Sequence, residues 1–178
     1  MDLIIWAKTL LTVQKYQKRV IGALGEIVKK RALASINNGA ENHAMSVSNE
    51  ILKLLERKDN LSGLYALTNM ALASIKEESA KILIRSFFDE VQKEKIASEF
   101  GFCERTAYRK IGNALSEFSS FIESKGFNCE NLFKLCKTED WILNTYKWIE
   151  TDTNAKNSKA PFSIINVLSK KQDRQFEL

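Results

Sequence analysis

One stretch of the sequence, residues 93–115, constrains the fold more than any other because its small and apolar residues stand at fixed offsets. It reads KEKIASEFGFCERTAYRKIGNAL. Two short helices that pack across a tight turn need such residues at a few positions and leave the other positions free. Gly101 stands where the first helix has to end, and glycine adopts the positive φ common at helix ends without steric cost. The spacing therefore predicts a helix-turn-helix.

The side chains that would hold this helix pair together are small or apolar. Ala97 is small enough to let the second helix cross the first closely, and residues after Ala107 recur at steps of three and four, which predicts one buried stripe through Phe118. The predicted structural residues of the pair are Ile96, Ala97, Phe100, Gly101, Phe102, Ala107 and Ile111.

The opposite face of the second helix is left free, and it is rich in hydrogen-bond donors. Arginine and lysine donate to phosphate and to guanine, and Thr106 can reach a phosphate near the helix start. We predict that this face reads double-stranded DNA. The candidate contact residues are Glu104, Arg105, Thr106, Tyr108, Arg109 and Lys110. The alternative is an ordinary amphipathic helix pair, although periodicity alone does not bring the alanines, the glycine and an arginine-rich face together.

The stretch resembles region four of bacterial sigma factors, and it is similar to the shorter sigma-like phage regulators of the ArpU and RinA kind. The family pattern runs roughly E-I-A-x-x-L-G-I-S-x-x-T-V-x-x-x-x-x-x-A-L. The matching residues here are Lys95-Ile96-Ala97, Phe100-Gly101-Phe102-Cys103, Thr106-Ala107 and Ala114-Leu115. The match is confined to residues 81–118, in which residues 81–89 take the place of the family's support helix.

Two departures from the family pattern concern Lys95, where the family has an acid, and Cys103, where it has a hydroxyl residue that caps the recognition helix. A thiol is a weak acceptor, so we expect a less firmly capped helix. The resemblance implies a sequence-specific transcriptional regulator that works in contact with RNA polymerase.

Two other functions remain open. A divergent or minimal sigma factor is the alternative within DNA binding, although residues 1–75 lack the D-L-x-Q-E-G type motif and the aromatic cluster of a promoter-melting region. From a different class, the alternative is a helical adaptor, such as an anti-sigma or replication-associated protein, that uses the basic first helix.

A single proline and seven glycines in 178 residues favour helices throughout the chain. We predict an all-α helical bundle that contains the sigma region-four-like helix-turn-helix. Its regions are an N-terminal helical region (1–75), the DNA-binding region (76–125) and a C-terminal helical extension (126–178) with a linker near 151–160.

The first helix is predicted over residues 2–36 because apolar residues follow a heptad seam that only Gln17 interrupts. Ile21 and Val28 widen the stripe beyond a two-helix seam, which favours packing in a bundle. The basic face of this helix is a solvated surface, a second phosphate-contacting surface or a docking face for an acidic partner. Its cations are Lys8, Lys15, Lys18, Arg19, Lys29, Lys30 and Arg31.

The middle of the chain is predicted to form shorter helices. A loop is expected at 37–44, a helix capped by Ser46 or Ser48, a break at 59–63, and a capping box of the Ser74–Glu77 kind. Met70 is expected to face inward, and the helix after the capping box is expected to be the centre of the core. Further helices are predicted at 128–137, at 138–150, where dense aromatics are core or a platform for bases, and from Pro161.

Composition excludes several classes of protein. Three cysteines without C-x-x-C spacing and one histidine predict no zinc site and no disulfide framework, and no phosphate loop or catalytic triad is present, so we expect no metal, no cofactor and no enzyme. A net charge of +5 is compatible with nucleic acid. No apolar run reaches the ~20 residues that span a bilayer, and a cytoplasmic protein is expected. The sequence leaves the oligomeric state open.

Overall fold

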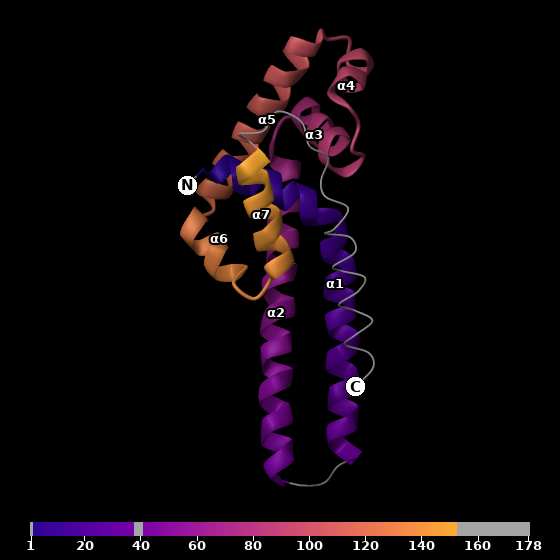
Figure 1. Ribbon diagram of the computed structural model, residues 1–178, viewed down its shortest axis with the longest axis vertical. Coiled ribbons are helices and arrows are strands. Elements are labelled where there is room, and N and C mark those ends of the chain that lie inside the picture. The colour runs from indigo at the N-terminus through magenta and orange to yellow at the C-terminus, as the bar shows by residue number, and fades with distance from the viewer. Residues whose placement is uncertain (1, 38–40, 153–178) are drawn as a thin grey trace.

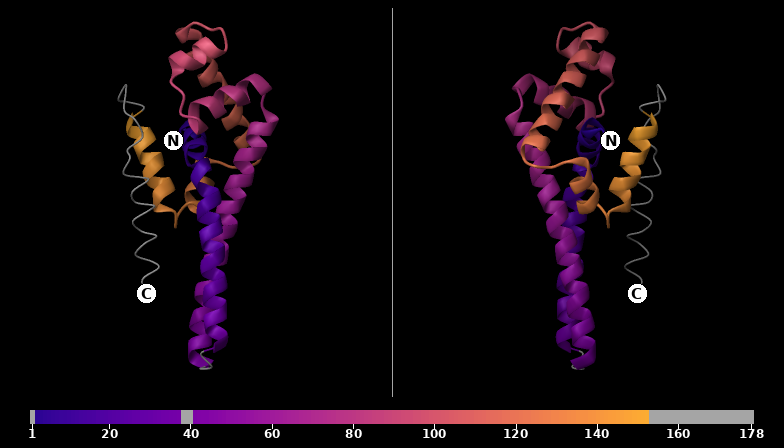
Figure 2. Two further views of the ribbon diagram at one scale, coloured as in Figure 1. Left: turned by 90° about the vertical axis from the view of Figure 1, so that its right-hand side faces the viewer. Right: turned by 90° about the vertical axis from the view of Figure 1, so that its left-hand side faces the viewer.

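The computed structural model describes residues 2–37 and 41–152, and every regular element in them is a helix. The long helices α1 (Leu3–Asn37) and α2 (Glu41–Ser74) form an antiparallel hairpin that extends far beyond the other helices (Figures 1 and 2). The prediction of an all-α fold is confirmed. The shorter elements are α3 (Glu77–Leu83), the π-helical turn η1 (Ile84–Phe88), α4 (Lys93–Glu99), α5 (Glu104–Ser124), α6 (Cys129–Leu135) and α7 (Asp140–Asp152).

Helix α1 forms as its heptad seam predicts, and its first half is the most buried part of the chain. Trp6, Leu10 and Leu11 are fully buried, and Gln17, which interrupts the seam, is fully buried as well. The first turns of α1 pack against α5, α6 and α7, whereas α2 runs along its whole length (Figure 1). The wide apolar stripe is therefore covered at this end of the hairpin.

The predicted break at residues 59–63 is wrong, because α2 continues unbroken from Glu41 to Ser74. Leu61 lies inside the predicted break and is fully buried. A glycine within a helix costs about 1 kcal/mol relative to alanine, and burial of a leucine side chain contributes about 1.5–3 kcal/mol. Packing against α1 thus outweighs the local signal. The loop predicted at 37–44 is shorter, and Ser46 and Ser48 lie within α2 rather than at its start.

The predicted capping box at Ser74 is also wrong. Ser74 is the last residue of α2, and its hydroxyl donates to the carbonyl of Met70, a back-bond common for serine in helices. Lys76 occupies the N-cap of α3 without a side-chain hydrogen bond. Met70, expected to face inward, is 49% exposed. Of the helix expected to form the centre of the core, only Ile82 and Leu83 are buried.

Aromatic rings join the start of α1 to the C-terminal helices. The ring of Trp6 lies 4.9 Å from that of Phe133 on α6 and 4.8 Å from that of Tyr146 on α7, measured between centroids. Trp141 and Ile142 are buried beside them. Trp141 and Tyr146 are therefore core residues, whereas Trp148 on the same helix is half-buried.

Two predictions fall partly or wholly outside the described residues. The linker near 151–160 begins with the last residues of α7, and the helix expected from Pro161 lies outside the description. Among the described helices, none is both long and apolar enough to cross a bilayer.

Candidate nucleic-acid interface

Helices α4 and α5 and the turn between them occupy the residues predicted for the motif. Ile96 and Ala97 are buried on α4, and Gly101 has a φ of +69°, the positive value expected there. The amide of Phe102 donates to the carbonyl of Ala97 over 2.8 Å, which closes the turn. The two helices and the turn at Gly101 are confirmed as secondary structure.

Helix α5 is strongly two-sided. Its buried residues repeat at three- and four-residue steps and face the core. They are Ala107, Ile111, Ala114, Leu115, Phe118, Ser119 and Ile122. The helix ends at Ser124, where Gly126 adopts a φ of +81° in the turn that follows. Phe100 and Phe102 are half-buried, and their rings stack with centroids 5.9 Å apart.

The N-terminus of α5 is capped by backbone alone, as the cysteine in the cap position suggested. Cys103 makes no capping hydrogen bond with its side chain. Its sulfur instead lies 3.2 Å from the hydroxyl oxygen of Thr106. This hydrogen bond, with further ones from backbone amides, lowers the pKa of the exposed Cys103 thiol.

Arg105 and Arg109 project from the first turns of α5 and are exposed. Within residues 2–37 and 41–152 neither makes an ion pair or a hydrogen bond, whereas Arg31, Arg57 and Arg85 each pair with a carboxylate. An arginine one turn after another places both guanidinium groups on the same face of a helix. The exposed face of α5 therefore presents two cations that are unpaired within the described residues.

The other candidate contact residues differ in how far they are already engaged. Glu104 is exposed beside Arg105. Tyr108 is 51% exposed, and the ammonium of Lys93 lies 4.3 Å from the centre of its ring. Lys110 is half-buried: its ammonium lies 3.0 Å from a carboxylate oxygen of Glu78 on α3 and 5.3 Å from the ring centre of Phe102. Lys110 thus fastens α5 to α3.

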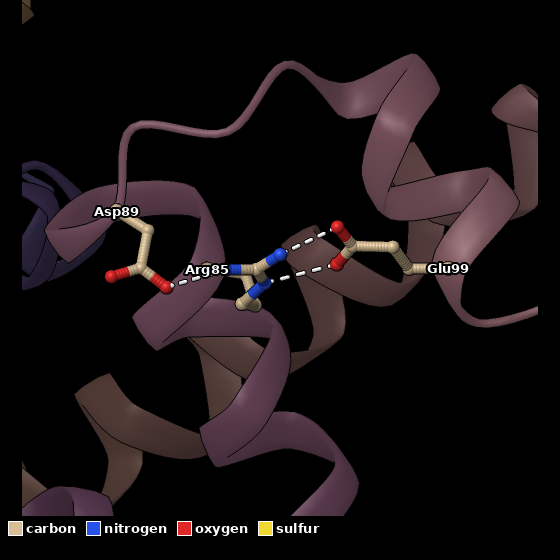
Figure 3. Close-up of polar contacts among 3 residues, drawn as sticks. All are labelled: Arg85, Asp89 and Glu99. Atoms are coloured by element: carbon tan, nitrogen blue, oxygen red, sulfur yellow. Dashed lines mark hydrogen bonds and ion pairs between the residues drawn. The ribbon is translucent and has the colours of Figure 1, made fainter.

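Arg85, for which the sequence predicts no role, holds α4 in place (Figure 3). The guanidinium of Arg85 on η1 donates two hydrogen bonds to Glu99 at the end of α4, at 2.9 and 2.5 Å, and a third of 2.9 Å to Asp89. The hydrogen bonds from Arg85 lower the pKa of Glu99. Arg85 and Asp89 have helical i, i+4 spacing, which could have been noticed, but no periodic signal links Arg85 to Glu99.

The turn between η1 and α4 is fixed to the hairpin by Glu90. This residue has a φ of +52°, which is uncommon for a residue other than glycine, and its carboxylate forms an ion pair with Lys15 on α1. The amide of Val91 donates to the carbonyl of Arg85 over 2.9 Å. Lys15, on the basic face of α1, therefore serves as an internal contact.

The described residues hold no group of three or more histidine, cysteine, aspartate or glutamate side chains that could bind a metal ion. Comparisons of the chain with protein-family models, with curated proteins and with solved structures found no match.

Proposed function

We propose that the protein is a sequence-specific regulator of transcription that binds double-stranded DNA with α4 and α5, placing α5 in the major groove. The observation that carries the proposal is the pair of exposed, unpaired arginines on the first turns of α5. Arginine reads guanine by two parallel hydrogen bonds to O6 and N7, and the major groove is wide enough to admit a helix.

The surroundings of these arginines support the same function. Lys93 and Lys95 are exposed on the first turn of α4, where they can contact a phosphate of the strand that α5 approaches. The rigid attachment of α4 through Arg85, and of α5 through Lys110, keeps the two helices in one orientation. A fixed orientation favours sequence reading over diffuse electrostatic attraction, because base contacts need a defined register.

The resemblance to sigma region four makes RNA polymerase the partner that we propose for regulation. A promoter-opening assay with core polymerase distinguishes a regulator from a minimal sigma factor. We expect no open complexes without another sigma factor. Open complexes formed with this protein alone would support the sigma-factor alternative.

Selection of bound sequences from random DNA tests the proposal directly. We expect one sequence to be enriched by the intact protein and enrichment to be lost when Arg105 and Arg109 are both replaced by alanine. A matched control replaces Lys137 and Lys147, which are also exposed cations. Both follow α5 in the sequence and lie outside α4 and α5. Enrichment of no sequence at all would favour the adaptor alternative.

A further inference from the structure

Among the side chains that the structure describes, the α1–α2 hairpin has no buried one between Leu24 on α1 and Leu61 on α2. Large apolar side chains are instead exposed there: Leu33 is 64% exposed, Met45 75% and Leu52 62%. Figures 1 and 2 show that only α1 and α2 form this part of the described structure. We call residues 18–37 and 45–59 the distal hairpin.

One side of the distal hairpin carries two rows of apolar and small residues, and we call this side the open face. Residues separated by three or four positions share a face of a helix, so two rows of half-buried residues flank the α1–α2 seam. Gln14 donates to Asn69 over 3.0 Å, and the Lys58 side chain reaches Gly25, which shows that the two rows lie on the same side. The rows are Ile21, Gly25, Val28 and Ala32 on α1, and Val47, Ile51 and Leu55 on α2.

The opposite side of the hairpin is already occupied near the base of the distal hairpin. Arg57 points away from Lys58 and binds Glu139, between α6 and α7, with a 3.0 Å bond from Nη2 and a second, shorter bond from Nε. The open face has no comparable covering element among residues 2–37 and 41–152.

The outer edge of the open face on α1 contains two glycines without a role in the chain's own packing. A Cβ on Gly22 would meet nothing within 4 Å, and one on Gly25 would meet only the end of the Lys58 side chain at 4.0 Å. Glycine lowers the stability of a helix interior relative to alanine. Its presence at two positions three residues apart is explained if a partner helix approaches closely there.

The outer edge of the open face on α2 complements the α1 edge in shape and in charge. Leu52 and Leu55 project along it and Asp59 follows one turn later, whereas the α1 edge carries Lys18 one turn before Gly22. Lys18 and Asp59 are exposed and form no ion pair within the described residues. Because Arg31 pairs with Glu50, the helices are in a register that sets Gly22 level with about Asp59.

We propose that the open face binds a second copy of this chain. The two hairpins would run parallel and form a four-helix bundle, with α1 of each copy against α2 of the other. A two-fold axis along the hairpin keeps the register of both copies, so Leu55 of one copy meets the glycine edge of the other and Asp59 comes within a turn of Lys18. An antiparallel pairing would set α1 against α1, and like charge disfavours it because this part of α1 carries Lys18, Arg19, Lys29, Lys30 and Arg31 against the single acid Glu26. Both α4–α5 pairs then lie at the same end of the dimer.

The size of the open face corresponds to a weak, reversible dimer. The 15 residues of α2 in the distal hairpin limit the length of this face, so it measures about 22 Å by about 20 Å, on the order of 450 Å² on each copy before the relief of the side chains is added. Standard interfaces bury about 800 Å² on each partner. The proposal does not depend on DNA binding, and it is tested without DNA.

The experiment measures the mass of the full chain by analytical ultracentrifugation and light scattering across a micromolar concentration series. We expect twice the 20.3 kDa of one chain. Leu52→Asp should raise the dissociation constant by about tenfold or more, as for a central interface residue. Met70→Asp is the matched control, since Met70 is an exposed apolar residue of the same helix outside the distal hairpin.

Gly22→Leu separates folding from association. Leucine favours a helix more than glycine does, and the space around Gly22 is open, so the variant should unfold at the same or a higher temperature and yet be monomeric. A monomeric intact protein, as expected if its own residues 161–178 or another protein cover the face, would overturn the proposal. So would a dimer that survives both Leu52→Asp and Gly22→Leu.

Discussion

The carboxylate of Glu99 accepts two hydrogen bonds from Arg85, so the end of α4 is fastened to η1 by a fork of parallel contacts. The geometry is the bidentate one in which an arginine restricts orientation as well as position. Both side chains are partly exposed. The pair therefore acts mainly on the orientation of α4 and less on overall stability.

Glu99→Gln tests this function of the pair. We expect weaker DNA binding with a small fall in the unfolding temperature, because α4 loses its fixed orientation. Hydrogen bonding to Arg85 lowers the pKa of Glu99, so the pair is complete at neutral pH. Its contribution to folding disappears as the pH falls below the ordinary glutamate value of 4.5. Glu94→Gln, on the same helix, is the control and should change neither binding nor the acid limb of the unfolding curve.

Arg109→Ala should cost about 1–3 kcal/mol in binding to the selected site and relax the preference at one base position. The physical reason is the loss of two hydrogen bonds to a guanine. Competition binding with site variants measures it. An equal loss on every sequence would assign Arg109 to phosphate, and unchanged binding would remove it from the interface.

Ala97→Glu and Gly101→Val should each abolish DNA binding. Ala97 is 3% exposed, so a glutamate there buries an unpaired charge between the helices. Gly101 has a φ of +69°, which strains a β-branched residue. Gly112→Ala is the control: this glycine is exposed on α5 with open space around it, and alanine should stabilise by up to about 1 kcal/mol. If Ala97→Glu or Gly101→Val stayed folded by circular dichroism and bound normally, the helix pair would not be the DNA-reading element.

Cys103 should react with alkylating agents far faster than Cys136. The hydrogen bond from Thr106 lowers the pKa of the exposed Cys103 thiol, whereas burial raises the pKa of Cys136 to about 12. Thiolate is the reactive form, so the rate at Cys103 should reach half its maximum below pH 9.0, the ordinary cysteine value. Mass spectrometry of labelled peptides over a pH series gives the rates. Thr106→Val should move the midpoint upward, and bound DNA should slow the labelling.

Arg57→Met should destabilise the fold by about 1–3 kcal/mol. Glu139 is 1% exposed and also accepts a 2.7 Å hydrogen bond from the Trp141 indole, so loss of the arginine leaves a buried carboxylate that is only partly compensated. Urea unfolding measures the effect. Arg31→Met is the matched control, because the Arg31–Glu50 pair is about half exposed and should contribute at most about 1 kcal/mol. Equal effects of the two substitutions would contradict the buried role of Glu139.

The elements that the sequence predicts well are those whose signal is local and repeated. The heptad seam of α1 and the stripe from Ala107 to Phe118 of α5 repeat over several turns, and each is found as a helix. At Gly101 the chemistry of a single residue is enough to predict the turn. The break predicted at 59–63 fails because glycine and polar residues weigh little against the burial of Leu61.

The contacts that fix the candidate interface could not be predicted in the same way. The sequence predicts a DNA-facing Lys110 from its position at the edge of the helix, but the acid that it meets depends on where α3 packs. Arg57 and Glu139 are separated by 82 positions in the chain, and no spacing rule links them. Such pairs follow from tertiary packing, which only the complete fold defines.

The contact of Trp6 with Phe133 and Tyr146 has a consequence for synthesis on the ribosome. The first turns of α1 are translated early, but the rings that cover Trp6 emerge only after most of the chain. At the ~5–20 residues per second of translation, the indole waits on the order of ten seconds without its partners. During that time the nascent hairpin exposes an aromatic surface to which chaperones can bind, and a ribosome that stalls before α6 leaves that surface uncovered.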